Sequence, residues 1–299
     1  ADHIIIGAGT EYLYNRLLQL LGSDVKFGVE NPGYRKITKI YDENGVDWDY
    51  VNIDDKGMKV DELRMKDINV AHVSPEHHFP IGLVMPVARR QELLNWAAEE
   101  PGRYIIEDDF DCEFRMQGKP IPSIQSRDRS HRVIYMNTFS KTMVPSLRIS
   151  YMVLPVDILE RYKETMSFYS CTVSSFEQYA LARFISGGYF ERHINRIKNY
   201  YKKLRVQIIN AIRESSIGEI SEIVEHHSGT HFLLKVKTDL SEEEINEKCL
   251  ENDLHILTYA DYIKDDTDSD KSMTLVINYA GINPERIDDV IKRIERVFE

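Results

Sequence analysis

Hydrophobic residues in the first half of the chain come in short runs that alternate with amphipathic stretches. Several runs are apolar almost throughout, which is typical of strands covered on both faces. Strands are predicted at His3–Gly7, Val25–Val29, Asp49–Ile53, Val70–Ser74, Tyr104–Asp108, Arg132–Met136 and Ile149–Leu154. Between them, Glu11–Leu21 and Ala88–Glu99 repeat apolar residues at helical spacing, with Leu13, Leu17, Leu20 and Leu21 on one face. This alternation predicts an α/β domain with a mainly parallel sheet.

The pattern changes after Pro155. Residues from Ile158 to about Glu214 are mostly helical, interrupted at Gly187 and Gly188. The remainder predicts a small α+β unit with strands at His231–Val236 and Met273–Tyr279 and helices at Ser241–Asn252 and Pro284–Phe298.

Two local signals refine this second half. Ser241 followed by Glu244 is a capping box, which fixes the start of a helix. The acidic run Asp265–Lys271 is expected to be a solvated loop. We therefore predict a large domain over residues 1–190 and a small C-terminal domain over 191–299 that includes the interdomain helix.

Composition excludes several classes of protein. The chain has 299 residues, with 38 Lys+Arg against 49 Asp+Glu, giving a net charge of −11. Such an acidic segment is a poor partner for phosphate backbones, so we expect no nucleic-acid binding by this segment itself. No apolar run reaches the roughly 18–20 residues needed to cross a membrane. Three cysteines without a CxxC pattern predict reduced thiols and a cytoplasmic protein, and the first residues lack the pattern of a signal peptide.

The turn between the first strand and the first helix reads Gly7-Ala8-Gly9-Thr10-Glu11. Glycines allow a sharp turn there, and the free amides of a helix N-terminus form an anion site. The sequence fits neither GxGxxG nor the Walker pattern, so it does not indicate nucleotide binding. Taken alone, such a turn serves packing at least as often as phosphate binding.

Two further strand ends carry candidate side chains. Glu107, Asp108, Asp109 and Asp111 surround the end of an apolar strand, where the sheets of α/β proteins bind ligands. A solvated loop or a helix cap is the alternative. Tyr34, in the turn after another strand, can stack on a planar ring or simply pack.

A lysine also follows a strand end. Thr138, Ser140 and Lys141 come directly after the strand Arg132–Met136, and Arg148 follows seven residues after the lysine. An amine beside hydroxyls and a guanidinium suits a carbonyl cofactor that bears a phosphate. A surface lysine and a structural arginine would explain the same residues.

Taken together in this order, these segments give the chain a family resemblance. It resembles the aminotransferase-like domain of fold type I pyridoxal-phosphate proteins and, within them, the MocR/GabR subfamily of GntR-type transcriptional regulators. The resemblance extends over essentially the whole chain. The segments that carry it are Ser74–Gly82, Ala88–Leu94, Glu107–Arg115, Thr138–Lys141 with Arg148, Glu177–Ala182 and Tyr189–Ile194.

The resemblance implies a cofactor, pyridoxal 5'-phosphate, and roles for individual residues. Lys141 would hold it as a Schiff base, and Asp108 would pair with the ring nitrogen so that the ring acts as an electron sink. Tyr34 would stack on the ring. Backbone amides and side chains around the phosphate would come from Gly9, Thr10, Glu11, Thr138, Ser140 and Arg148.

Three departures from the family pattern bear on activity. Phe110 stands where regulators of this type usually have a tyrosine that bonds the phenolic oxygen of the cofactor, a role left to His77, His78 or water. No arginine occurs in Asp266–Gly281, where transaminases of this fold grip the substrate carboxylate; Val276 lies there. The resemblance also implies a winged-helix DNA-binding domain before Ala1, a segment that this chain does not contain.

Three functions stay open on the sequence. The first is a sensor domain of a bacterial regulator, in which a ligand that resembles an amino acid controls DNA binding by the other domain. The second is a genuine aminotransferase acting on an amino acid and a 2-oxo acid. The third is a dimerisation module without cofactor. A homodimer is expected from the resemblance.

Overall fold

The computed structural model describes residues 2–115, 121–224, 229–264 and 272–299. It divides into a large unit, formed by Ala1–Phe79, Leu83–Glu113 and Gly118–Ile194, and a small unit, formed by Pro80–Gly82, Phe114–Gln117 and Asn195–Glu299. The chain passes from one to the other within the long helix α8 (Tyr189–Arg213).

The sheet of the large unit has the strand order β1-β8-β7-β6-β5-β2-β3-β4. Its strands are β1 (Ile4–Ala8), β2 (Phe27–Asn31), β3 (Trp48–Asp54), β4 (Gly57–Met58), β5 (Val70–Val73), β6 (Tyr104–Asp108), β7 (Val133–Thr138) and β8 (Ile149–Val153). The central strands β3, β2, β5, β6 and β7 are parallel, whereas β1, β8 and β4 join antiparallel. The predicted α/β class and mainly parallel sheet are confirmed; only the two-residue β4 had no counterpart among the predicted strands.

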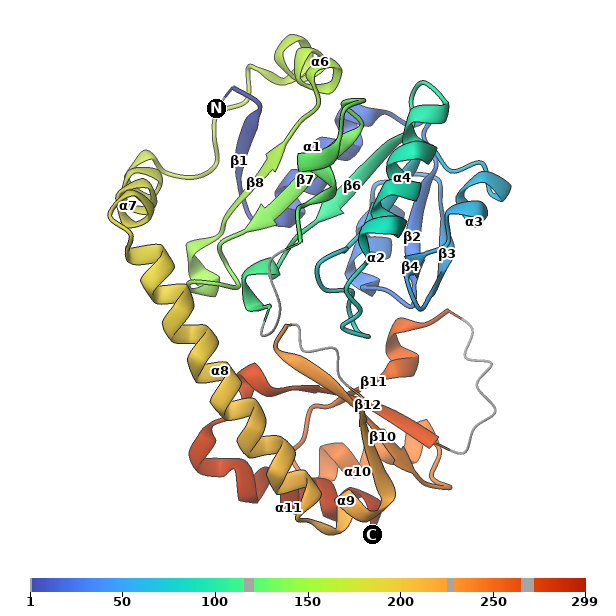
Figure 1. The fold of residues 1–299 in the computed structure, drawn as a ribbon, viewed down its shortest axis with the longest axis vertical. Helices are drawn as coiled ribbons and strands as arrows, with labels where there is room; N and C mark the ends of the chain where they lie inside the picture. The colour runs from blue at the N-terminus through green and yellow to red at the C-terminus, as the bar shows by residue number, and fades with distance from the viewer. Residues whose placement is uncertain (1, 116–120, 225–228, 265–271) are drawn as a thin grey trace. The chain divides into compact units, whose positions relative to one another are not determined.

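Helices cover both faces of this sheet (Figure 1). One hydrophobic core joins the sheet to α1 (Thr10–Leu21), α2 (Arg35–Glu43) and α6 (Val156–Met166). A second core, on the other face, joins it to α3 (Val60–Met65), α4 (Val87–Glu99) and α5 (Ile124–Arg127). The leucines expected on the inner face of α1 are all buried. Coverage on both faces explains why every residue of β5 and β6 is buried.

The small unit is built on an antiparallel sheet with the order β11-β12-β10-β9. Its elements are α9 (Ser216–Ile220), β9 (Ser221–Val224), β10 (His231–Lys237), α10 (Glu242–Glu251), β11 (Leu257–Thr258), β12 (Ser272–Asn278) and α11 (Ile287–Phe298). The predicted capping box is present at the start of α10, where Ser241 and Glu244 bond each other's backbone N–H. The predicted loop Asp265–Lys271 lies outside the described residues.

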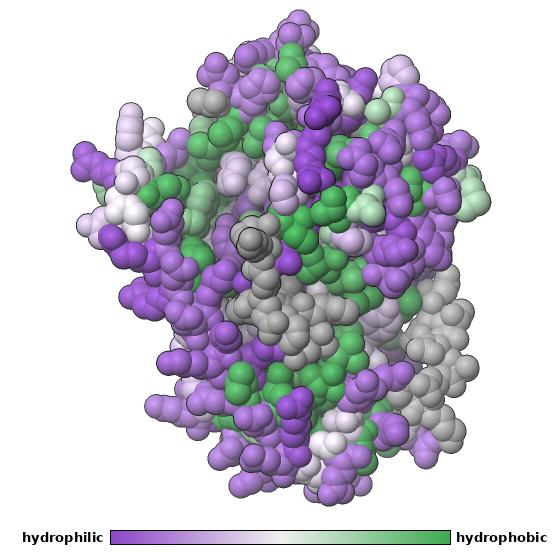
Figure 2. All heavy atoms as spheres, in the orientation of Figure 1, coloured by the Kyte–Doolittle hydropathy of each residue, from purple (hydrophilic) through white to green (hydrophobic). Residues whose placement is uncertain are grey.

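The long helix α8 is amphipathic. Leu204, Ile208 and Ile212 are almost fully buried in the core of the small unit, while the surface over this helix is largely hydrophilic in Figure 2. A further helix, α7 (Ser175–Ser186), precedes it. Among the described residues, no helix has the length and apolar character required to span a membrane.

Candidate functional site

The register of the sheet gathers the predicted phosphate-binding residues at one edge of the large unit. Because β8 runs antiparallel to both neighbours, its first residues lie beside the last residues of β1 and β7. Ala8 pairs with Ile149, and Thr138 pairs with Ser150. Gly9, Thr138 and Arg148 therefore come together, although they are far apart in the sequence.

Gly9 leaves room for the guanidinium of Arg148. Its φ of 98° lies in the region that favours glycine. A Cβ at this position would lie 2.1 Å from Nη2 of Arg148 and would clash with it. The chain then enters α1 at Thr10, whose amide belongs to the free N–H groups of the helix start. Backbone and guanidinium thus form a cradle for an anion.

Glu11 occupies part of this cradle with its own carboxylate. Its Oε2 accepts a hydrogen bond from Arg148 Nη2 at 2.5 Å, and its Oε1 pairs with Lys36. Burial works against the charged form, but the bonds from Lys36 and Arg148 prevail and lower the pKa of Glu11 to about 2. A phosphate that enters the cradle competes with Glu11 for Arg148.

Two hydroxyls lie at the end of β7, and they differ in their hydrogen bonds. Thr138 Oγ1 accepts hydrogen bonds from Ser150 Oγ at 2.8 Å and from the Ser140 N–H at 3.2 Å. Ser140 Oγ is buried and has no hydrogen-bond partner within the described part of the chain. Since a buried polar group without a partner is costly, this hydroxyl is ready to bind an oxyanion.

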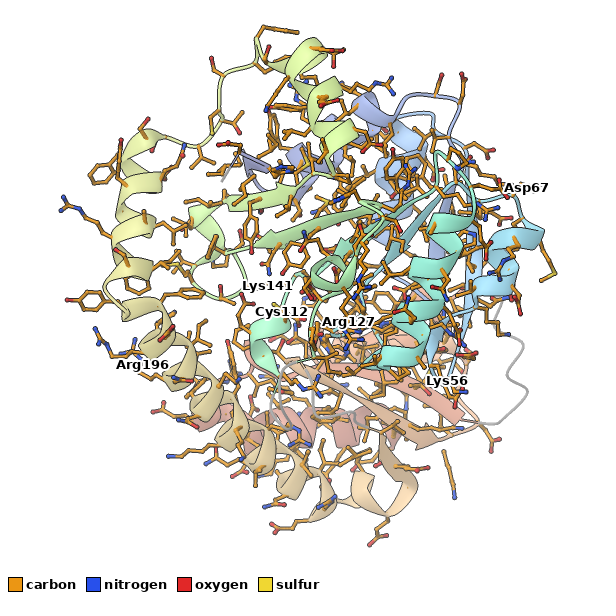
Figure 3. The ribbon with its side chains drawn as sticks, turned by 45° about the horizontal axis from the view of Figure 1, so that its top comes forward. Lys56, Asp67, Cys112, Arg127, Lys141 and Arg196 are labelled. Carbon is orange, nitrogen blue, oxygen red and sulfur yellow. The ribbon has the colours of Figure 1, made fainter. Side chains whose placement is uncertain are left out.

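Lys141 lies on the loop that follows β7. Figure 3 shows it at the same edge of the sheet as Cys112, which follows the neighbouring strand β6. Lys141 is exposed, and its Nζ makes neither an ion pair nor a hydrogen bond with the residues that the structure describes. The amine is therefore available for a ligand at the ends of β6 and β7.

Asp108, the last residue of β6, is the buried carboxylate of this edge. Its Oδ2 accepts a hydrogen bond from the hydroxyl of Tyr14 at 2.5 Å. Its Oδ1 is equally buried but has no hydrogen-bond partner among the described residues. One oxygen is thus held in place and the other is left to accept a hydrogen bond from a ligand.

Sequence reasoning missed the residues behind Asp108. Tyr14 and Tyr41 come from α1 and α2, and both bond to His72 of β5. The signal for His72 was present, because it is a polar residue inside an otherwise apolar strand. The tyrosines gave no comparable signal, since a tyrosine on the apolar face of a helix is most simply a core residue.

Tyr34 lies directly before α2 and is half exposed. Its ring makes an edge-to-face contact with Phe79, with the centroids 5.9 Å apart. The side chain is thereby oriented, while enough of the ring stays uncovered to stack on a ligand.

The histidines considered as substitutes for the missing tyrosine are both held by other groups. The His77 ring lies 6.0 Å from the Phe110 ring, and its Nδ1 bonds Asp111 at 2.7 Å. His78 bonds the carbonyl of Pro32 at 3.0 Å, and burial lowers its pKa to about 4, which keeps it neutral.

Further carboxyls are buried on the opposite face of the sheet from Asp108. Burial, reinforced by the charges of Glu107 and Glu76, raises the pKa of Asp109 to about 8. Burial likewise raises the pKa of Glu107 to about 7. Arg90 pairs with Glu76 at 2.8 Å and offsets part of this negative charge. The described residues contain no group of side chains suited to a metal ion.

Comparison with known proteins shows which family shares this arrangement. The model for aminotransferase class I and II matches residues 1–294. The chain belongs to the class I and II aminotransferase family.

The proteins that are similar to this chain include some named as regulators and some named as enzymes. YdeL and YhdI of Bacillus subtilis, both named uncharacterized HTH-type transcriptional regulators, are 36% identical over 302 residues and 38% identical over 295 residues. The matches cover 100% and 99% of this chain but only 63% and 62% of the regulators. The solved kynurenine aminotransferase of Pyrococcus horikoshii matches with a TM-score of 0.81 and 27% identity, covering 98% of this chain and 74% of that one.

Pyridoxal phosphate is the cofactor of this family, and the edge described above fits it. The free Oδ1 of Asp108 suits the N–H of a pyridinium ring. The cradle of Gly9 and Arg148, with the free hydroxyl of Ser140, suits the phosphate. Lys141 offers the amine.

The buried carboxyls predict how stability depends on pH. The pKa of Asp109 is about 8 in the folded chain, against an ordinary value of 3.8. The folded state therefore holds this proton more tightly than the unfolded state. The stability that results is complete below pH 3.8 and is lost as pH rises through 8, by at most about 1.4 kcal/mol per pH unit. Glu107 acts in the same direction.

Asp109→Asn, which is neutral at every pH, should flatten this decline. Urea unfolding between about pH 5 and pH 9 measures it. The matched control is Asp55→Asn, at an exposed aspartate, which should retain the slope of the parent chain. An Asp109→Asn slope equal to that of the parent would show that Asp109 is not protonated in the fold.

Proposed function

We propose that this chain is the cofactor-binding sensor domain of a bacterial transcriptional regulator, in which a small amino-acid-like ligand controls DNA binding by another part of the protein. Lys141 holds pyridoxal phosphate covalently in this proposal. The observation that carries it is the combination of an available amine with a half-satisfied buried carboxylate at one sheet edge.

When bound, the cofactor supplies an electron sink for the bonds at an amino-acid α-carbon. The residues of the chain would hold it and orient it. Asp108 Oδ1 would accept a hydrogen bond from the ring N–H, and the Tyr34 ring would stack on one face of the cofactor ring. Arg148 and Ser140 would hold the phosphate, with Glu11 displaced from part of its pairing with Arg148.

Two features support a sensor over an efficient enzyme. The stretch from Asp266 to Gly281 contains no arginine, so the bidentate carboxylate grip expected there of transaminases is missing. Phe110 has no hydroxyl to offer to a cofactor oxygen. The relatives YdeL and YhdI, which are named regulators, also match the full length of this chain.

Control of DNA binding requires a ligand with different affinities for two states of the protein. The regulators that match this chain are longer than it, and we assign the DNA contact to a segment outside residues 1–299. The acidic charge of the chain agrees with this assignment. We place the protein in the cytoplasm, in keeping with its free cysteines.

A homodimer belongs to the same proposal. Phe168 and, on α7, Phe176 and Tyr179 each expose 73% or more of their surface. Large aromatic side chains exposed together favour burial against another surface, here that of a second copy.

The alternative is a genuine aminotransferase. The solved kynurenine aminotransferase supports it, since it shares the fold with 27% identity over nearly the whole chain. Enzyme and sensor would use the same cofactor site, and only the enzyme would convert the bound ligand into a product.

The first test concerns the lysine. Mixing the protein with pyridoxal phosphate should give a visible absorption band that is absent in Lys141→Ala, because that variant lacks the amine. Lys163→Ala, at an exposed position on α6, is the control and should retain the band. A parent protein that stays colourless would contradict both the sensor and the enzyme.

The second test separates sensor from enzyme. The loaded protein is mixed with single amino acids and 2-oxoglutarate, and both thermal unfolding and 2-oxo-acid release are followed. We expect an amino acid to raise the melting temperature while product forms far more slowly than the roughly 1–10³ s⁻¹ typical of enzymes. Turnover within that range would establish the aminotransferase.

A further inference from the structure

A buried row of three side chains from three different elements lies behind Asp108. Tyr41 of α2 contacts His72 Nδ1 at 2.7 Å, and Tyr14 of α1 contacts His72 Nε2 at 3.4 Å. Tyr14 in turn bonds Asp108 Oδ2 at 2.5 Å. Tyr41, His72 and Tyr14 each expose 5% or less of their surface, so water does not satisfy their polar groups.

The chemistry of the groups fixes the direction of donation along this row. A carboxylate only accepts, so the proton of the Tyr14 hydroxyl points to Asp108. The Tyr14 oxygen can then only accept, which assigns the His72 proton to Nε2. With a single proton on its ring, His72 then accepts a hydrogen bond from the Tyr41 hydroxyl at Nδ1. Every proton in the row is therefore donated toward Asp108.

We propose that Tyr14 is a positioning residue: its hydroxyl holds Oδ2 of Asp108, so that the free Oδ1 is ready for the ring nitrogen of the cofactor. This inference rests on the proposed cofactor site. It adds that Tyr14, acting through Asp108, determines whether the ring nitrogen of the cofactor carries a proton. Tyr14 does not touch the cofactor in this proposal; it acts through Asp108.

The group that donates a hydrogen bond to Asp108 carries no charge, because it is the hydroxyl of Tyr14. Within the described residues, no lysine or arginine contacts Asp108, and the His72 Nε2 lies 3.8 Å from Oδ2. A hydrogen bond to the charged form of a buried carboxylate favours that form. Since Tyr14 brings no positive charge, the charge of Asp108 is not neutralised and stays available to a protonated ring.

The other ionisable groups nearby are consistent with this arrangement. Burial, and then the charge of Asp108, raises the pKa values of Tyr14 and Tyr41, so both hydroxyls keep their protons. The charge of Glu11, on α1, adds to the rise in the pKa of Tyr14. Burial, reinforced by the charge of Asp108, raises the pKa of Glu30, on β2, to about 8. Glu30 therefore holds a proton at neutral pH and adds no second negative charge beside Asp108.

The test locates the ring proton directly. The full chain is loaded with pyridoxal phosphate that carries ¹⁵N in the ring, and its ¹⁵N chemical shift is recorded. The parent should show a protonated ring nitrogen. In Tyr14→Phe, which keeps the ring of the side chain but removes the donor, the shift should move toward the unprotonated value, and affinity for the cofactor should fall by roughly tenfold.

Two further variants serve as a control and as a second test. Tyr12→Phe removes a hydroxyl from the same helix, at a residue stacked on Arg16, and should leave the shift unchanged. Tyr41→Phe removes the far end of the row and should move the shift in the same direction but less, which keeps the proposal testable if Tyr14→Phe does not fold.

An unchanged shift in Tyr14→Phe, or in Tyr41→Phe where only that variant folds, would overturn the inference and leave the cofactor site intact. A parent protein that binds no cofactor at all would instead overturn the proposed function. The two failures are therefore distinguishable.

Discussion

A negative charge buried at the end of a parallel strand is the constraint on which the rest of this site depends. Asp108 lies where β6 ends and, among the residues that the structure describes, accepts one side-chain hydrogen bond, from Tyr14. A buried carboxylate needs hydrogen bonds to its oxygens. The described residues supply one to Oδ2 of Asp108 and none to Oδ1. The remaining oxygen makes the site a receptor for a ring that carries its own N–H. Helix α1 links Asp108 to the phosphate cradle, because it carries Tyr14, which bonds Oδ2 of Asp108, and begins at Thr10.

Much of this arrangement was predictable from the sequence because it depends on local patterns. Apolar runs located the strands, and a strand that ends in Asp108 or Thr138 places these residues at the same edge of a parallel sheet. The sequence could not show that β8 runs antiparallel and brings Arg148 to Gly9, nor that Glu11 pairs with that arginine. The row from Tyr41 to Tyr14 depends on three elements that meet only in the folded core.

Proteins named as regulators and a solved aminotransferase are both similar to this chain. The groups that would hold the ring and phosphate lie within the large unit, and they form a site whether or not turnover occurs. The sequence of β12 contains no arginine that could grip a substrate carboxylate, and Val276 pairs there with Leu233 and Leu257 of the neighbouring strands; this agrees with the proposed sensor. Binding without efficient conversion is the behaviour that a sensor requires.

The proposed covalent bond between Lys141 and the cofactor can be tested at the level of single residues. The protein is mixed with pyridoxal phosphate, reduced with borohydride, digested and analysed by mass spectrometry. We expect one phosphopyridoxyl group, on the peptide that contains Lys141. A label spread over surface lysines such as Lys163, or no label at all, would contradict it.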